Sequence, residues 1–429
     1  MGRGSREGKD RLFFINMDIN DVNRVCVVGW GKSGRSLCKL LLELGKKVKI
    51  SEIKERSAFS TAVIDEFIDK GVEFEFGGNS DKFIKESQLV VLSPGVDTAN
   101  SDACKIAKTY DIDVVGEIEL SFWLTQAQVI AITGTNGKTT TSQLTRQVLK
   151  KKRKRVFLGG NIGIPFSSFV LETKKDDLVV LEISSFQLET IREFKPHVSA
   201  LLNIASDHLD RYVNFSDYFD AKMNIFMNQD KNDWALINNK LDLNGIKDRV
   251  NSKVLRFSNE FSNENFSCAY KIGSIFGVSR AECDDVFRSF KGLVHRMQFV
   301  RRLRQIDFIN DSKATNPTST VWALSNVTSS VLLIAGGKDK GLDFSEIIPH
   351  LDKVKKVFLF GEASVKIKNE ISPYVKTEVF TSLRDSVNKS FQEATASDVI
   401  LLSPMCSSYD MFTDYVDRGN RFIEIVNNL

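Results

Sequence analysis

The most specific chemical signal in the sequence is a polar loop that begins at Gly134 and reads Gly-Thr-Asn-Gly-Lys-Thr-Thr. A glycine-rich turn with a lysine and a hydroxyl at the start of a helix is the pattern of a phosphate-binding loop. In that pattern Lys138 binds the β- and γ-phosphate oxygens and Thr139 binds Mg²⁺. The loop departs from the usual G-x-x-x-x-G-K-[ST] pattern because Ile132 occupies the position of the first glycine. The apolar run before it and the helical stretch after it favour ATP binding over a chance match.

A second glycine-rich loop, Gly-Trp-Gly-Lys-Ser-Gly at residues 29–34, also follows a short apolar run. Glycines permit a tight turn and let backbone N–H groups approach an anion at a helix N-terminus. Glu52, at the end of the next apolar run, is placed to hold a ribose hydroxyl. Taken alone, this loop fits a dinucleotide, a nucleotide-sugar or a turn that binds nothing.

Acidic and imidazole side chains follow two apolar runs in the middle of the chain and indicate a metal site. Glu182 ends one run 44 residues after Lys138. That spacing puts a carboxylate, a hard oxygen ligand that suits Mg²⁺, beside the phosphate loop. A solvated strand end is the alternative, and it is favoured if Glu182 is taken alone. His208 stands between Asp207 and Asp210 after another run. It suits metal ligation or proton transfer, and a histidine that is only hydrogen-bonded is the alternative.

Three further charged runs have two interpretations each. Residues 310–316 (Asn-Asp-Ser-Lys-Ala-Thr-Asn) suit a carboxylate substrate or, alternatively, a helix-capping turn. Residues 336–341 are a second Gly/Lys loop, either an anion site or a turn. The basic run 150–155 resembles a nucleic-acid patch, but the helix after the phosphate loop should end there. Because cations offset the dipole at a helix C-terminus, we expect a solvated helix end.

Short β-branched runs that alternate with helical stretches must position these loops. The alternation predicts parallel, doubly wound α/β sheets, in which ligands bind beyond the carboxyl ends of the strands. The predicted strands are residues 25–28, 48–50, 74–76, 89–92, 128–133, 177–181, 198–202, 306–309, 331–334, 357–360 and 399–402. We predict three α/β domains: a Rossmann-like domain at 17–115, a central phosphate-loop domain at 116–295 and a Rossmann-like domain at 296–429.

Composition excludes several classes of protein. The 429 residues suit about three domains. The balance of 59 basic to 55 acidic residues is too even for a dedicated nucleic-acid binder. The six cysteines include no Cys-x-x-Cys pair, which predicts reduced thiols in a cytoplasmic protein. No apolar run approaches the ~20 residues of a membrane span. Residues 1–16 lack the apolar core of a secretory signal, so we interpret them as a tag or an extension. Met17 serves equally well as the natural first residue.

Taken together, these strings resemble the Mur ligases of peptidoglycan synthesis from about Arg24 to Phe422. Gly-Thr-Asn-Gly-Lys-Thr is shared by the whole family. The strings at 181–189 (Leu-Glu-Ile-Ser-Ser-Phe-Gln-Leu-Glu), 207–212, 310–316 and, near the C-terminus, 402–408 with 418–420 resemble the D-glutamate-adding member. Four such strings in the same order are specific for that member.

The resemblance implies an ATP-dependent carbon–nitrogen ligase that adds D-glutamate to UDP-N-acetylmuramoyl-L-alanine. It implies that ATP phosphorylates the alanyl carboxylate and that the amine of D-glutamate displaces phosphate through a tetrahedral intermediate. Two anions must meet, which calls for Mg²⁺ and lysine. Also implied are two Mg²⁺ sites, a C-terminal domain that closes the site, and a cytoplasmic monomer with no nucleic-acid or membrane partner.

Residue by residue, the resemblance implies three groups of site residues. The ATP-binding group is Gly134, Thr135, Asn136, Gly137, Lys138, Thr139, Thr140, Asn265, Arg296, Asp311 and Lys313, with His295 beside it. The substrate-binding group is Ser33, Glu52, Ser93, Gly95, Asn161, Gln187 and Arg211 for the nucleotide-sugar peptide, and Thr315, Lys340, Ser408 and Tyr415 for D-glutamate. The metal-binding group is Thr139, Glu182, His208 and a carbamylated Lys222, and the catalytic residues are Lys138, His208 and Lys222.

The chain departs from the family pattern at a few positions. Family members often carry His-Asn-x-x-Asn near the adenine, whereas this chain has Glu264 and Cys268 at the outer positions of that string. Tyr415 stands where phenylalanine is common, and Lys338 where an acid occurs in relatives. Neither Tyr415 nor Lys338 belongs to the ATP-phosphate or metal chemistry, whereas Cys268 removes the second amide of the adenine string.

Rival interpretations explain fewer of these residues. Another ligase of the family, adding a different amino acid or extending folate, is the nearest alternative. An NAD-dependent oxidoreductase explains the loop at 29–34 but leaves Lys138, Glu182 and His208 without a role. A nucleic-acid-binding NTPase explains the run at 150–155 and predicts an affinity that falls steeply with salt.

Overall fold

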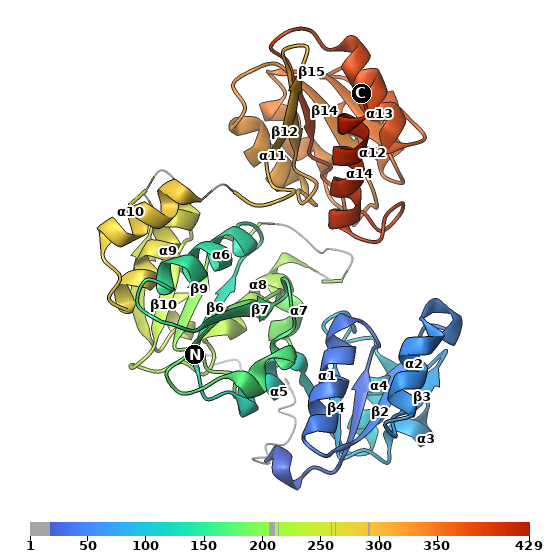
Figure 1. The fold of residues 1–429 in the computed structure, drawn as a ribbon, viewed down its shortest axis with the longest axis vertical. Helices are drawn as coiled ribbons and strands as arrows, with labels where there is room; N and C mark the ends of the chain where they lie inside the picture. The colour runs from blue at the N-terminus through green and yellow to red at the C-terminus, as the bar shows by residue number, and fades with distance from the viewer. Residues whose placement is uncertain (1–17, 206–210, 213, 259, 262, 291) are drawn as a thin grey trace, which may run out of the picture. The chain divides into compact units, whose positions relative to one another are not determined.

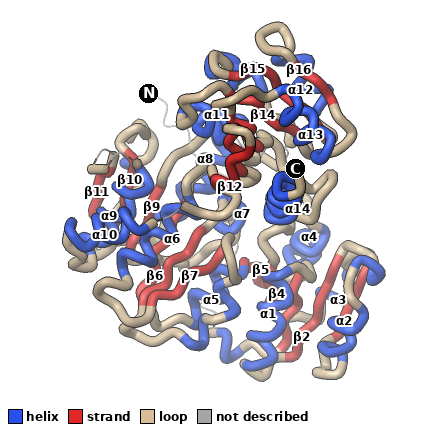
Figure 2. Tube along the Cα trace, turned by 45° about the horizontal axis from the view of Figure 1, so that its top comes forward, coloured by secondary structure: helices blue, strands red, loops and turns tan. Residues whose placement is uncertain are grey.

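The computed structural model describes residues 18–205, 211–212, 214–258, 260–261, 263–290 and 292–429. The proposed extension at 1–16 and His208 therefore lie outside the described residues. The chain divides into two compact units, which we call unit 1 and unit 2. Unit 1 comprises Met1–Gly134, Thr141–Leu202 and Asp220–Cys283, and unit 2 comprises Thr135–Thr140, Asn203–Phe219 and Asp284–Leu429. Figure 1 follows the chain from blue to red, and Figure 2 shows how helices and strands alternate along it.

The first sheet, which belongs to unit 1, has five parallel strands in the order β3-β2-β1-β4-β5. Side chains of successive residues point to opposite faces of a strand. Accordingly, Val25 and Val27 of β1 join one buried cluster while Cys26 and Val28 join another. The elements are β1 (Arg24–Val28), α1 (Lys32–Glu43), β2 (Lys47–Glu52), α2 (Thr61–Ile68), β3 (Glu73–Phe76), α3 (Asp81–Ile84), β4 (Leu89–Leu92), α4 (Asp102–Thr109) and β5 (Asp113–Gly116). The order reverses between β1 and β4, so their carboxyl ends flank the place where such sheets bind ligands.

The second sheet, also in unit 1, has six parallel strands in the order β11-β10-β9-β6-β8-β7. Its strands are β6 (Gln128–Thr133), β7 (Val156–Gly160), β8 (Leu178–Glu182), β9 (Val198–Leu201), β10 (Trp234–Asn238) and β11 (Lys253–Phe257). Its helices are α5 (Glu117–Leu124), α6 (Lys138–Leu149), α7 (Ser185–Leu188), α8 (Phe215–Met223), α9 (Glu264–Ile275) and α10 (Arg280–Ser289). The order reverses between β6 and β9, which places the phosphate loop at the switch point.

The third sheet belongs to unit 2 and has the order β12-β13-β17-β14-β15-β16. Only β12 runs antiparallel to its neighbour, across a hairpin whose turn residues Arg304 and Gln305 have positive φ. Separate buried clusters cover the two faces of this sheet. Its elements are β12 (Gln298–Leu303), β13 (Ile306–Asn310), α11 (Pro317–Ser325), β14 (Val331–Gly336), β15 (Val354–Phe360), α12 (Ser364–Ile371), β16 (Thr377–Val379), α13 (Leu383–Glu393), β17 (Val399–Leu402) and α14 (Tyr415–Asn427).

The three-part α/β architecture predicted from the sequence is confirmed, and every predicted strand is present. The strands that the sequence reasoning missed are β5, β7, β10, β11, β12 and β16. Except for β10, which is apolar and largely buried, they are short, glycine-containing or partly exposed and charged. All six cysteines are free and five are buried, in agreement with the reduced thiols expected. Within the described ranges, no helix combines the length and apolar character that crossing a bilayer requires.

Candidate active site

The phosphate loop lies at the carboxyl end of β6 and leads directly into α6. Gly137 has a φ of +83°, a conformation that a side chain would strain, so the glycine is required by the turn. The ammonium of Lys138 donates a hydrogen bond to the carbonyl oxygen of Thr135 at 2.8 Å. The lysine is therefore folded back over its own loop. Thr139, the next residue of the helix, is 5% exposed.

Asn203, which follows β9, braces this loop. Its Oδ1 accepts the backbone N–H of Asn136 at 2.8 Å, and its Nδ2 donates to the carbonyl oxygen of Asn136 at 3.0 Å. The hydroxyl groups of Thr135 and Tyr218 lie 3.0 Å apart. The sequence reasoning missed Asn203 and Tyr218, although the position of Asn203 directly after a predicted strand was a signal that could have found it.

Lys222, in α8, is a buried lysine beside the phosphate loop. It is 1% exposed, and its Nζ lies 3.1 Å from the carbonyl oxygen of Gly134. Burying a lysine is costly unless its polar head has partners. The sequence-predicted Lys222 and Gly134 are thus brought together within unit 1.

Glu182, the last residue of β8, lies opposite Ile132 of β6 and is 2% exposed. Its Oε1 accepts a hydrogen bond from Nδ2 of Asn161 at 2.8 Å. The carbonyl oxygen of Glu182 leaves no room for a side chain at Gly160, whose Cβ would lie 2.3 Å away. Asn161 and Glu182, predicted to serve the substrate and the metal respectively, are therefore in direct contact.

The donor set suits Mg²⁺ in its chemistry, because the carboxylate of Glu182 and the hydroxyl of Thr139 are hard oxygen ligands. An ammonium is no metal ligand, so Lys222 needs chemical modification to join the set. Among the described residues, no group of three or more His, Cys, Asp or Glu side chains is arranged to hold a metal ion. His208 lies outside those residues.

A pocket of about 770 Å³ opens in unit 1 at the switch point of the first sheet. Six of the seven residues predicted to contact the nucleotide-sugar line it, namely Ser33, Glu52, Ser93, Gly95, Asn161 and Gln187. Arg211 is not among its lining residues. Lys32 donates a hydrogen bond to the carbonyl oxygen of Gly163, joining two walls of the pocket.

The carboxylate of Glu52 organises the glycine loop at the pocket floor. Its Oε2 accepts the backbone N–H of Trp30 at 2.6 Å, and its Oε1 accepts the N–H of Lys54 at 2.9 Å. The Trp30 ring is buried edge-on against Phe67 and Phe74, with centroids 5.0 and 4.9 Å away. A contact between Glu52 and a ribose stays a prediction, while its hold on the loop backbone is observed.

The remaining predicted residues of the third sheet lie before β12, on the loops that follow β13, β14 and β17, and at the start of α14. Asp311 directly follows β13 and is 3% exposed. Its oxygens accept the N–H of Met297 at 3.2 Å and the hydroxyl of Ser403 at 3.0 Å. Burial raises the pKa of Asp311 to about 6. The ammonium of Lys313 lies 5.0 Å from the ring centroid of Tyr415.

His295 is also buried, and burial lowers its pKa, so the neutral imidazole is favoured. Its Nδ1 lies 2.9 Å from Nδ2 of Asn310. In unit 1, Asn265 of α9 accepts a hydrogen bond from the hydroxyl of Thr141 at 3.0 Å, which ties it to α6. The ATP-binding prediction thus draws residues from both units.

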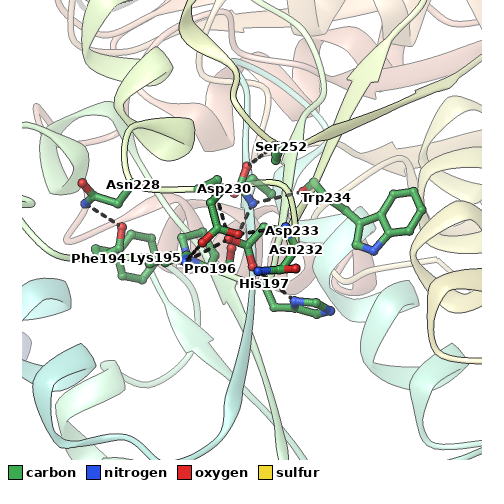
Figure 3. Close-up of polar contacts among 12 residues, drawn as sticks. Phe194, Lys195, Pro196, His197, Asn228, Asp230, Asn232, Asp233, Trp234 and Ser252 are labelled. Carbon is green, nitrogen blue, oxygen red and sulfur yellow. Dashed lines mark hydrogen bonds and ion pairs between the residues drawn. The ribbon is translucent and has the colours of Figure 1, made fainter.

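Figure 3 shows a charged cluster at the amino ends of β9 and β10, the opposite ends of the strands from the phosphate loop. Lys195 Nζ lies 2.6 Å from Oδ2 of Asp230, and His197 Nδ1 lies 3.3 Å from Oδ1 of Asp233. Ligands bind at the carboxyl ends of parallel strands. We therefore interpret this cluster at the amino ends as structural: its ion pairs hold the first residues of β9 and β10 together. The basic run at 150–155 is exposed just beyond α6, as expected for a solvated helix end.

Three family models match the chain. They are described as "Mur ligase MurD-like, N-terminal domain" at residues 23–116, "Mur ligase middle domain" at 132–282 and "Mur ligase, glutamate ligase domain" at 295–406. Together they span most of the sequence, and each coincides with one of the three sheets. The chain therefore belongs to the Mur ligase family.

Its curated relatives point to one member of that family. A UDP-N-acetylmuramoylalanine--D-glutamate ligase of Caldanaerobacter subterraneus subsp. tengcongensis is 36% identical, with 95% of this chain and 98% of the relative covered. A protein of the same name from Caldicellulosiruptor saccharolyticus is 37% identical, with 95% and 99% covered. Among solved structures, the MurF ligase of Thermotoga maritima in complex with ADP has a TM-score of 0.59 at 16% identity, covering 89% of this chain and 94% of that one. At that identity the structure supports the fold alone.

Proposed function

We propose that this enzyme joins D-glutamate to UDP-N-acetylmuramoyl-L-alanine at the expense of ATP, in the synthesis of peptidoglycan precursors. The relatives that carry this name match nearly the whole chain. The observation that carries the chemistry is the phosphate loop at the end of β6, with Lys222 bonded to its first residue, Gly134, and Glu182 opposite Ile132 of the same strand. An oxidoreductase would have no use for these three buried or loop-bound groups.

The residues suit a reaction that begins with phosphorylation. A carboxylate is a poor electrophile until one of its oxygens becomes a phosphate leaving group. In our proposal, Gly134–Thr140 bind the phosphates of ATP, and Asn265, Arg296, Asp311 and Lys313 bind the rest of the nucleotide. The positive charge of Lys138 offsets charge on the transferred phosphoryl group. The amine of D-glutamate then attacks the acyl phosphate, and the tetrahedral intermediate collapses to an amide and phosphate.

The pocket of about 770 Å³ is the proposed site of the nucleotide-sugar peptide. Its volume is in the range of small-molecule sites, and its glycine loop offers backbone N–H groups at the start of α1 to a diphosphate. Arg211 is proposed to contact the same substrate from outside the lining. D-Glutamate is assigned to Thr315, Lys340, Ser408 and Tyr415 in unit 2.

Mg²⁺ is proposed to be held by Thr139, Glu182, His208 and Lys222, with two ions in the full site. Carbamylation of Lys222 converts an ammonium into an anionic oxygen ligand, and its burial beside Gly134 favours a group held in one place. When bound, Mg²⁺ neutralises phosphate charge and polarises the oxygens that react.

We also propose the domain boundaries, the cellular location and the oligomeric state of the enzyme. The domain boundaries 17–115, 116–295 and 296–429 are kept as predicted. The proposed substrates, ATP and a nucleotide-sugar, imply that the enzyme works in the cytoplasm. We propose a monomer, with no nucleic-acid partner, whose C-terminal domain closes over the substrates.

The test is phosphate release from ATP and Mg²⁺ with UDP-N-acetylmuramoyl-L-alanine, comparing D-glutamate, L-glutamate and no amino acid. We expect release that requires both the nucleotide-sugar and D-glutamate and that disappears in Lys138→Ala. Release without either substrate, or none from a folded sample, would contradict the proposal. Folates and other amino acids, tested in the same assay, then distinguish the other ligases of the family.

A further inference from the structure

Arg418, in the first turns of α14, is a buried arginine with 0% exposure. Its Nη2 donates to the carbonyl oxygen of Ser312 at 2.7 Å, and its Nε donates to the hydroxyl of the same serine at 3.0 Å. Its Nη1 donates to the carbonyl oxygens of Cys406 at 3.1 Å and Ser407 at 3.3 Å, and lies 3.5 Å from that of Gly336. One guanidinium thus contacts three separate segments of chain.

Those three segments follow neighbouring strands of one sheet. Ser312 follows β13, Cys406 follows β17, and Gly336 ends β14, and these strands are adjacent in the order β13-β17-β14. The same loops carry Thr315, Ser408 and Lys340, three of the four residues proposed for D-glutamate. The fourth, Tyr415, begins α14, and its carbonyl oxygen accepts the hydroxyl of Ser312 at 2.8 Å.

The packing around the guanidinium leaves no room for a side chain at two neighbouring glycines. A Cβ on Gly337, whose φ is +137°, would lie 2.2 Å from the carbonyl oxygen of Ser407 and 3.0 Å from Nη1 of Arg418. A Cβ on Gly419 would lie 2.2 Å from Nδ1 of His295. Two glycine-containing strings that the sequence analysis singled out, 336–341 and 418–420, therefore meet around this arginine and its neighbour.

Each acceptor of Arg418 is a carbonyl or hydroxyl oxygen, and within the described chain no carboxylate forms an ion pair with it. Burial of a cation without an anionic partner is expensive. Desolvation lowers its pKa to about 10, which still leaves the group charged at neutral pH. A guanidinium is retained here because its planar fork satisfies several carbonyl groups at once, which an ammonium on a flexible stem cannot do.

We infer that Arg418 is a positioning residue for the amino-acid substrate: it fixes the three loops and the start of α14 that together form the D-glutamate site. This inference rests on the proposed function. It predicts that disturbing the fork changes the affinity for D-glutamate, while the nucleotide-sugar pocket, whose lining lies in unit 1, keeps its own affinity.

The experiment compares the KM of each of the three substrates in Arg418→Lys and Ser312→Ala. Arg418→Lys keeps the charge but not the fork, and we expect the KM for D-glutamate to rise about tenfold. Ser312→Ala removes only one hydroxyl, and a rise of roughly fivefold is expected. The KM for the nucleotide-sugar should stay within about twofold, and so should kcat, because neither variant removes a group that contacts the reacting atoms. The KM for ATP is not a control here, because Asp311 and Lys313, on either side of Ser312, are proposed to bind the nucleotide.

Arg421→Met is the matched control, because this arginine lies on the same helix, is 61% exposed and pairs with Glu424 at 3.0 Å. It should leave every KM unchanged. Thermal unfolding of all variants separates loss of fold from loss of affinity, and Ser312→Ala keeps the test usable if Arg418→Lys unfolds.

Wild-type KM values in a folded Arg418→Lys would overturn the inference, and so would equal rises in all three KM values. The wild-type assay distinguishes this failure from failure of the proposed function. Phosphate release that never depends on D-glutamate would contradict the function itself. Dependence on D-glutamate combined with an inert Arg418→Lys would contradict only the role of the arginine.

Discussion

Nδ2 of Asn161 donates a hydrogen bond to Oε1 of Glu182 at 2.8 Å, so one amide connects the nucleotide pocket to the carboxylate at the end of β8. Asn161 lines the pocket, and Glu182 is 2% exposed. The orientation of a buried carboxylate depends on the donors that hold it. The two residues therefore form a unit through which the substrate side and the proposed metal side of the site are coupled.

Asn161→Ala should raise both the KM for the nucleotide-sugar and the Mg²⁺ concentration that gives half-maximal activity. We expect about tenfold for each, because a hydrogen bond to a charged group is lost. Steady-state kinetics over a Mg²⁺ series measures both quantities. Asn244→Ala, at an exposed turn where the side chain donates to Asp242 at 3.1 Å, is the control. An unchanged Mg²⁺ requirement would separate Asn161 from the metal site.

Lys138→Met should lower kcat by roughly 10³-fold, because it removes a positive charge aimed at developing phosphate charge. The fold should persist, because methionine keeps the length of the side chain and the hydrogen bond lost to the carbonyl oxygen of Thr135 lies within the loop itself. Lys150→Met, an exposed lysine just past the end of the same helix, should behave as wild type. Phosphate release with both substrates present is the measurement, and a folded Lys138→Met with normal kcat would argue against a phosphate-binding loop.

Asn203→Ala tests the brace that sequence reasoning missed. The variant removes two side-chain hydrogen bonds to Asn136, at 2.8 and 3.0 Å. We expect a loss of about 1–3 kcal/mol in the free energy of unfolding and an increase of about tenfold in the KM for ATP, with the KM for the nucleotide-sugar unchanged. Urea unfolding and initial rates provide the two measurements.

Asn239→Ala serves as the control for this brace, because that asparagine follows the next strand, β10, but is exposed and bonds Ser258 instead. Equal effects of the two variants on the KM for ATP would mean that Asn203 acts only through general stability.

The elements that position the site could be predicted from the sequence because their signals are local. The β-branched run at 128–133 and the glycines and lysine that follow it fall within a dozen residues. The phosphate loop and Glu182 lie where the parallel-sheet rule puts them. By contrast, β12 is half-exposed and rich in arginine, and its turn at Arg304 and Gln305 lacks the asparagine–glycine signal of a hairpin.

The contacts that could not be predicted from the sequence join residues that are far apart along the chain. Asn203 contacts a loop 67 residues away, and Arg418 contacts Ser312 at a separation of 106 residues. An arginine on a helix is normally a solvated residue. The family string at 418–420 marked Arg418, but residue type and helical position alone do not distinguish its burial from the exposure of Arg421. Likewise, Glu52 was predicted from its place at the end of β2, but the hydrogen bond that it accepts from the backbone of Trp30 forms only when β1 and β2 pair.

Asp311→Asn should reveal the cost of burying a carboxylate in unit 2. Burial raises the pKa of Asp311 from 3.8 in a free side chain to about 6, so the folded state binds more protons than the unfolded state between these values. Stability contributed by this group is therefore fully present below pH ~4 and is lost as the pH rises to about 6. An asparagine still accepts the N–H of Met297 and can pair with the hydroxyl of Ser403, but it does not titrate.

Urea unfolding of the wild type and of Asp311→Asn across pH 4 to 7.5 measures this effect. The free energy of unfolding of the wild type, relative to the variant, should fall by on the order of 3 kcal/mol between pH ~4 and ~6 and stay constant above that range. The same variant separates fold from function, because a carboxylate needed for ATP would leave Asp311→Asn stable but with a raised KM for ATP at neutral pH. A difference in stability that is constant with pH, or that grows as the pH rises, would show that the carboxylate is ionised in the folded protein throughout and that burial does not control its proton.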